Sequence, residues 1–338
     1  MNSPASPANR YSNFSSALAL EQQERRKQRL LGILSKGLPT LPAYVLDLNA
    51  LLSSASVDLK KVGNVIRTDP SLSAQVLRLC NSALFGLRRR VISIEQAAIL
   101  LGTERLRTLV LTCSVMQFAG KRLAPAQLMA FWQHSFLAAL LSERIARQLE
   151  YFEKEQAYLG GLLHDIGQLP LWILVMEEEA KGKPLPPADW PDNAALEYDY
   201  FGMDHCKVGR WMAVAWNFMP SFIDVFEHHH APARAEHDPY LVGIVAAADQ
   251  FLLTQAEVPL PNADSETPLS EPSPRIDSEG PSFIQQSLPL LSETERQALM
   301  EMLQTEYIHL LPLVQLGLAS AATGTAETAL SQKSGGEQ

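Results

Sequence analysis

The residues of this sequence with the most obvious capacity for chemistry are histidines and aspartates in otherwise apolar segments. A buried imidazole or carboxylate costs several kcal/mol unless it is paired or bound to a metal. The set comprises His134 in FWQHSFLAAL, the doublet His164-Asp165 in GGLLHDIGQL, His205 in FGMDHCKVG, His228, His229 and His230 in FEHHHAP, and Asp249 in AAADQFLL. Together these side chains supply imidazole and carboxylate ligands for one or two divalent metal ions.

Each of these residues also has a simpler explanation when it is taken alone. His134 is compatible with a hydrogen-bonded core histidine, and the histidine run is compatible with a helix C-terminus, whose dipole favours positive charge. Asp249 is compatible with a helix end that faces water. The combination favours a metal site, in which a carboxylate such as Asp165 bridges two ions. A pair of ions about 3.5–4 Å apart can activate a water molecule and bind a phosphate.

The composition is that of an ordinary folded protein with an acidic surface. The 338 residues are 46% hydrophobic and 19% charged, and the formal net charge is −9. An acidic surface repels a phosphate backbone, so we expect no DNA binding. Arg88, Arg89 and Arg90 form a basic cluster that is compatible with a phosphate or an acidic partner, although such clusters more often face water in a loop.

Cysteine usage and hydropathy predict a cytoplasmic protein. Cys80, Cys113 and Cys206 lie far apart in the chain, and reduced thiols are typical of the cytosol. Cys206 follows His205, but neighbouring side chains on a helix point about 100° apart, so we expect Cys206 to pack in the core. The longest apolar stretch, residues 169–176, is far shorter than the roughly 18 residues that cross a bilayer. We therefore expect neither a signal peptide nor a membrane segment.

Helical periodicity extends through most of the chain, and no convincing run of alternating strand residues interrupts it, so we predict an all-α protein. The predicted organisation is a disordered N-terminus (1–15), an N-terminal helical half (16–120), a second helical half with the candidate metal site (121–255), a flexible Pro/Ser-rich insertion (256–290), a C-terminal helix (291–318) and a disordered tail (319–338).

The order of several motifs resembles the HDOD domain, an HD-related output domain of bacterial signalling proteins that is similar to the HD-GYP phosphodiesterases. The motifs are LPTLPAYVLDL, VIRTDPSLSAQVLRLCNSALFG, ISIEQAAILLG, FWQHS, GLLHDIGQL, DHCKVGRWMAVAWNFMPSFI and HHHAP, between Gly37 and Leu252. The resemblance implies a multi-helical fold with a small N-terminal half and a larger HD-like half. It also implies a cytoplasmic regulatory protein of bacterial signal transduction, whose partners are signalling proteins or a nucleotide second messenger.

Similarity to the two-metal HD-GYP enzymes implies a role for each ligand. One ion would be held by His134, His164, Asp165 and Asp249, and a second by His205, His229 and His230, with Asp165 as the bridge and the catalytic carboxylate. We align the family's histidine pair with His229-His230 because Ala231-Pro232 follows it, and His228 is an alternative one residue away. An imidazole-rich set of this kind favours iron or manganese among the divalent transition metals.

Two departures from the HD-GYP pattern bear on catalysis. The lysine that resembles a phosphate contact in those enzymes is Gln168 here, and APARAEHD follows the histidines in place of the Gly-Tyr-Pro signature. The first hypothesis is therefore a regulatory protein that binds metal and acts through a partner or a nucleotide without turnover. The alternative is a metal-dependent phosphohydrolase acting on a nucleotide or cyclic dinucleotide, because the ligand set is complete.

Overall fold

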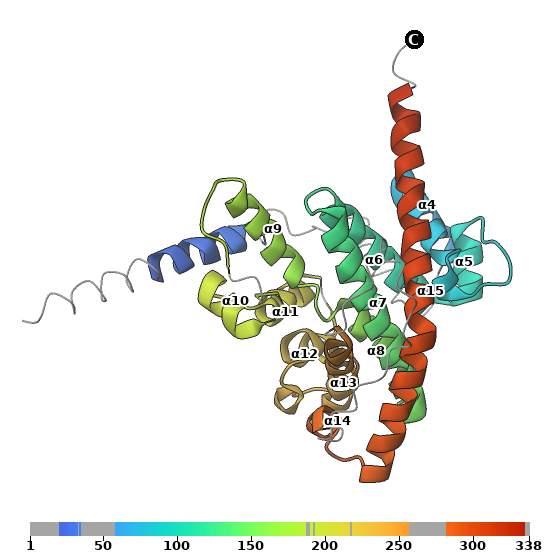
Figure 1. Ribbon diagram of the computed structural model, residues 1–338. Coiled ribbons are helices and arrows are strands. Elements are labelled where there is room, and N and C mark those ends of the chain that lie inside the picture. Colours follow the sequence, from blue (N-terminus) through green and yellow to red (C-terminus); the bar gives the residue numbers. More distant parts are fainter. Residues whose placement is uncertain are drawn as a thin grey trace, which may run out of the picture.

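The computed structural model consists of packed helices, with no strand among the residues it describes (Figure 1). These are residues 20–32, 34, 58–186, 190–191, 193–216, 218–256 and 282–334. The predicted all-α class is confirmed. The segments 1–15, 257–281 and 335–338 lie outside the described residues, so the disorder and flexibility expected there stay predictions.

Four α-helices and a short 3-10 turn form the first group. They are α3 (Leu59–Arg67), α4 (Pro70–Cys80), η1 (Ala83–Phe85), α5 (Ile94–Leu101) and α6 (Thr103–Gly120). Their starts follow from capping chemistry. The Asp69 side chain accepts hydrogen bonds from the backbone N–H groups of Ser71 and Leu72, and Pro70 occupies the first turn of α4. Helix α6 packs on α4 and α5.

Seven α-helices form the second group, which carries the histidines and aspartates. They are α7 (Pro125–Gln148), α8 (Lys154–Leu163), α9 (Gln168–Glu179), α10 (Ala194–Phe201), α11 (His205–Ala215), α12 (Pro220–His228) and α13 (Pro239–Ala256), with η2 (Pro232–Arg234) before α13. Helix α7 lies at the centre and packs against both α8 and α13. One described segment, Lys154–Glu179, is long and apolar enough to cross a membrane, but 83% of its apolar window is buried inside the protein. It is therefore part of the core.

The N-terminal helical residues 20–32 contact α9 and α10 of the second group. Arg29 forms ion pairs with Glu177 and Glu178 at the end of α9, and Gln23 donates a hydrogen bond to the backbone oxygen of Tyr198 in α10 at 2.7 Å. Figure 1 shows this segment in blue beside α9 and α10. The predicted N-terminal half, residues 16–120, includes this segment. In the structure its Arg29 meets the acidic end of α9, which is distant in sequence.

The C-terminal helices differ from the predicted boundaries. Helix α14 (Ser282–Ser287) lies inside the segment 256–290 that we expected to be flexible, and its Ile284 is fully buried. Helix α15 (Glu293–Ser334) extends past the predicted end at 318. Alanine is frequent in residues 319–330, and alanine has the highest helix propensity, so low complexity there does not prevent helix formation. Helix α15 contacts both α7 and α4 and so connects the two groups (Figure 1).

The close approach of α7 and α8 depends on Gly161. A Cβ at this position would lie 2.6 Å from the backbone oxygen of Ala138 and 2.7 Å from Oγ of Ser142. We expect Gly161→Ala to lower the free energy of unfolding by about 1–3 kcal/mol, because the helices must separate. Urea denaturation measures this. Gly209→Ala is the matched control, since its Cβ would meet Phe226 at an ordinary 3.5 Å. Equal losses in both variants would contradict the tight contact.

Candidate metal centre

The first cluster brings together four predicted ligands from two helices and a turn. His134 lies in α7, His164 and Asp165 follow α8, and Asp249 lies in α13. Nε2 of His134 lies 3.3 Å from Nε2 of His164 and 3.2 Å from Oδ1 of Asp249, and Nε2 of His164 lies 3.4 Å from the same oxygen. One donor atom from each of the four residues lies within 4.8 Å of all the others.

The second cluster contains the remaining three predicted ligands and one residue that we had assigned to the core. His205 is the first residue of α11, and His229 and His230 follow α12. Nε2 of His205 lies 3.2 Å from Nε2 of His229 and 3.0 Å from Nε2 of His230. The added residue is Cys206, whose Sγ lies 3.4 Å from Nε2 of His205. The structure thus brings all seven predicted residues into two adjacent clusters, and it favours the His229-His230 alignment.

Asp165 lies between the two clusters and presents one carboxylate oxygen to each. Its Oδ2 lies 3.4 Å from Nε2 of His164 and 3.6 Å from Nε2 of His134. Its Oδ1 lies 3.4 Å from Nε2 of His229 and 3.6 Å from Nε2 of His205. This is the geometry that a carboxylate bridging two cations requires.

Contacts behind the clusters orient three of the imidazole rings. Nδ1 of His164 lies 2.8 Å from the backbone oxygen of Gly161, and Nδ1 of His229 lies 3.0 Å from that of Val225. A carbonyl oxygen only accepts, so each Nδ1 donates, and in the neutral ring the Nε2 lone pair faces the cluster. Nδ1 of His205 is held in the same way by Oε2 of Glu197. Lone pairs that converge at such short separations repel one another unless a cation lies between them.

Distances and burial both fit metal ions. Two donors that are each about 2.1 Å from one ion lie about 3.0 Å apart at a right angle and about 3.4 Å apart at a tetrahedral angle. Five of the donor separations, at 3.0–3.4 Å, match this range, and two that involve Asp165 are slightly longer at 3.6 Å. Oδ1 of Asp165 and both carboxylate oxygens of Asp249 are buried without a hydrogen-bond partner. Unpaired buried carboxylate oxygens are costly, and a bound cation would remove that cost.

Without a cation, the imidazoles and carboxylates shift one another's pKa. Burial opposes charge on His164, but Asp165 and Asp249 outweigh burial and hold its pKa well above the ordinary value. Burial would raise the pKa of Asp165, but His164 outweighs it and holds that pKa well below the ordinary range. Burial lowers the pKa of His229 to about 3. Protons and metal ions therefore compete for several of the same nitrogen atoms.

Two residues of the centre were not identified from the sequence. Glu197 in α10 is fully buried, and its Oε2 accepts from the backbone N–H and from Nδ1 of His205, each at 2.7 Å. Glu197 does not stand at a spacing that is typical of metal ligands. In the sequence it is noticeable only as an acid among apolar and aromatic residues of a helix. Cys206 is buried as expected, but its Sγ also faces the cluster. The side chains of His205 and Cys206 point about 100° apart at the start of α11. Even so, Sγ of Cys206 lies only 3.4 Å from Nε2 of His205.

One side of the centre is accessible to solvent. The side chains of His134 and His230 are 25% and 22% exposed, whereas those of His164, His205, His229 and Asp249 are fully buried. A ligand would therefore approach between the first and second clusters past His134 and His230.

The helical fold and the two adjacent clusters define an all-α protein with a candidate two-ion centre. The HDOD domain family model matches residues 38–232, which is more than half of the chain. The chain belongs to the HDOD domain family.

Solved structures share the helical fold. An HDOD domain protein with unknown function from Geobacter sulfurreducens is 23% identical, with 87% of this chain and 98% of that chain covered and a TM-score of 0.61. A "Putative phosphohydrolase" from Shewanella amazonensis SB2B is 26% identical, with 85% and 96% covered and a TM-score of 0.59. A "Putative signal transduction protein" from Marinobacter aquaeolei VT8 is 18% identical, with 90% and 66% covered and a TM-score of 0.61.

A curated relative is longer than the matched region. An uncharacterized protein of Treponema pallidum (strain Nichols) is 23% identical over 225 residues, which are 64% of this chain and 42% of that relative. The match thus spans less than half the length of this relative.

Metal stoichiometry tests the bridging position of Asp165. We expect one or two transition-metal ions per chain, measured by elemental analysis after anaerobic and aerobic purification. Asp249→Ala should remove the ion of the first cluster and His205→Ala that of the second. Asp165→Ala should weaken both, because each of its oxygens faces a different cluster. Unchanged metal content in Asp165→Ala would contradict the assignment.

Glu197 should act on the metal through His205. Glu197→Gln replaces a carboxylate that orients the ring, so we expect about 10- to 100-fold weaker binding at the second cluster, measured by chelator competition. The matched control is Glu143→Gln, a buried acid that pairs with Arg105 and Arg147 outside the clusters. This control should lose stability but not metal affinity. Equal metal loss in both variants would show a merely structural effect.

Cys206 should be a ligand of the second ion. A thiolate bound to Co²⁺ gives a sulfur-to-metal charge-transfer band in the near ultraviolet, because thiolate is a soft ligand. We expect this band in the cobalt-loaded protein and its loss in Cys206→Ala, while Cys113→Ala retains it. If the band is absent from the cobalt-loaded wild-type protein, the Sγ contact is only a hydrogen bond to His205.

Proposed function

We propose that this protein is a cytoplasmic, bacterial regulatory protein of signal transduction that binds a phosphate-bearing ligand at a two-ion centre with little or no turnover. The observation that carries the proposal is the position of Asp165, with one oxygen toward each cluster. Iron or manganese is favoured, since imidazole and carboxylate donors dominate the set. The signal-transduction designation of the Marinobacter protein supports the class. The three buried cysteines are free thiols, in keeping with a reducing compartment.

The accessible side of the centre determines what can bind. Ions at the two clusters would supply water activation and positive charge for a phosphate. His164, His229 and Asp249 are enclosed and would hold the ions in place. His134 and His230 are partly exposed and would border the ligand, so an anionic group would reach the centre from their side.

Gln168 is the reason to expect weak turnover. It begins α9, its backbone N–H donates to the backbone oxygen of Asp165 at 2.9 Å, and it is buried. A lysine at this position in HD-GYP enzymes would place a charge beside the phosphate, whereas an amide offers only a hydrogen bond. Loss of such a contact costs about 2–4 kcal/mol of transition-state stabilisation, or roughly 30- to 1000-fold in rate.

The second candidate function is a metal-dependent phosphohydrolase acting on a nucleotide or cyclic dinucleotide. It is favoured by the complete donor set and by the phosphohydrolase designation of the Shewanella protein. In this case Asp165 would help to hold both ions, which would supply water activation and positive charge for the phosphate. The two candidates share a metal centre and differ in rate.

Hydrolysis assays separate these functions. Metal-loaded protein is incubated with cyclic di-GMP, a nucleotide panel and an activated aryl phosphodiester. We expect weak or no turnover by the wild-type protein and about 30-fold or greater acceleration in Gln168→Lys. Gln148→Lys, on the surface at the end of α7, is the charge-matched control. Robust wild-type turnover that Asp165→Ala abolishes would replace the regulatory proposal with the phosphohydrolase.

A further inference from the structure

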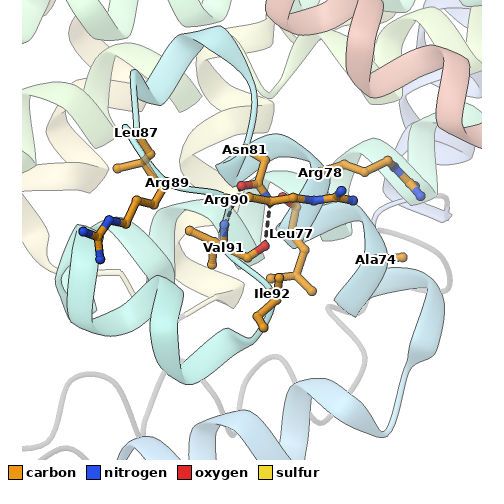
Figure 2. Close-up of a pocket in the computed structure, with 9 residues that line it drawn as sticks. All are labelled: Ala74, Leu77, Arg78, Asn81, Leu87, Arg89, Arg90, Val91 and Ile92. Atoms are coloured by element: carbon orange, nitrogen blue, oxygen red, sulfur yellow. Dashed lines mark hydrogen bonds between the residues drawn. The ribbon is translucent and has the colours of Figure 1, made fainter.

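A cavity of about 720 Å³ lies in the first group of helices, separate from the metal centre. Its lining comes from α4 and from the loop before α5, and no lining residue belongs to the histidine–aspartate clusters (Figure 2). Its volume lies within the range of sites that hold small molecules.

Hydrogen bonds hold the loop of this cavity in place. Oδ1 of Asn81, at the end of α4, accepts from the backbone N–H of Val91 at 2.7 Å, and its Nδ2 donates to the backbone oxygen of Val91 at 2.8 Å (Figure 2). The backbone N–H of Ile92 donates to the side chain of Gln96 at 3.0 Å. Gly86 begins the loop at a φ of 55°, which favours glycine. The cavity wall is therefore held in place just after the arginine run.

The cavity concentrates positive charge in an acidic protein. Arg78, Arg89 and Arg90 line it, and none of the described lining residues is acidic. Within the described part of the chain, no ion pair or hydrogen bond joins these three arginines to another residue, and Nε of Arg78 is buried without a partner. By contrast, Arg67 pairs with Glu95 close by. An anion in the cavity would give the terminal guanidinium nitrogens of these arginines an acceptor.

The lining also has an apolar part. Leu77 and Val91 contribute to the wall, and Ile92 is 77% exposed at its edge. In Figure 2 the side chains of Arg78 and Arg90 extend toward one side of the cavity, whereas Arg89 extends toward the other. Guanidinium groups bind phosphate oxygens and stack on flat rings. A ligand with a phosphate and a flat, weakly polar ring would use both parts of the lining.

From this arrangement we infer that the cavity is a nucleotide-binding site distinct from the metal centre, with Arg78 and Arg90 as its phosphate contacts. A nucleic-acid strand is a poor occupant, because the positive charge is confined to one cavity on a protein of net charge −9. The inference does not depend on the metal-centre proposal, because the two sites share no residue.

Titration calorimetry on the full chain with EDTA tests the site without a contribution from bound metal. The probes are ATP, GTP, cyclic di-GMP and inorganic phosphate. We expect at least one nucleotide to bind with Kd below about 1 mM, and inorganic phosphate to bind at least about tenfold more weakly. Arg90→Ala and Arg78→Gln should each weaken nucleotide binding about tenfold or more, because each removes a charged hydrogen bond.

Arg88→Ala is the matched control, since Arg88 is exposed in the same run but does not line the cavity. It should change Kd by less than about threefold, as expected for a general charge effect. Arg90 is also exposed, so its variant should retain the wild-type melting temperature. The inference is overturned by any of three results: no nucleotide binding at about 1 mM, equal weakening in Arg88→Ala and Arg90→Ala, or phosphate affinity equal to that of the best nucleotide. Metal content and hydrolysis are measured in separate experiments. Their results test the metal centre and the proposed function, and not this inference.

Discussion

The buried carboxylate of Asp165 is the constraint on which the candidate centre depends. It lies between two groups of imidazoles, with an oxygen toward each, and only 4% of its side chain is exposed. Removing such a group from water is costly unless positive charge surrounds it. Protonated histidines can supply that charge, but so can metal ions, which would also satisfy the converging Nε2 lone pairs and the orphaned oxygens of Asp249. The donor geometry is suited to metal ions.

The helices place the metal-ligand candidates around Asp165 from different directions. Helices α7 and α13 each present one ligand from the middle of the helix, whereas His164 and Asp165 lie in the turn between α8 and α9. Histidines at the start of α11 and after α12 complete the second cluster. Gly161 permits the close packing of α7 on α8, and its carbonyl also orients His164. Packing and ligand orientation thus use the same residue.

The two clusters are chemically unequal. The first combines two imidazoles with carboxylates, while the second has three imidazoles and a nearby thiol. Softer donors at the second cluster favour a different metal from the first, so a mixed pair of ions is compatible with the centre. Under the proposed function, Gln168 at the position of the HD-GYP lysine would permit metal binding without turnover. A separate arginine-lined cavity in the first helical group would let the protein respond to a small anionic ligand without changing its metal ligands.

The sequence by itself determined the helical class, the family and the seven metal-ligand candidates, because helical periodicity, the His-Asp doublet and the order of motifs are local properties of the chain. Only the tertiary structure decided that these seven side chains converge and that Asp165 faces both clusters. It also placed Glu197 and Cys206 at the second cluster, where neither follows a ligand spacing. The contact of residues 20–32 with α9 and α10 was likewise beyond local patterns, whereas the extent of α15 agrees with the helix propensity of its alanines. The reason is physical. Burial, lone-pair direction and helix contacts depend on residues that are far apart in the sequence, and the spacing of residues along the chain does not show which of them meet.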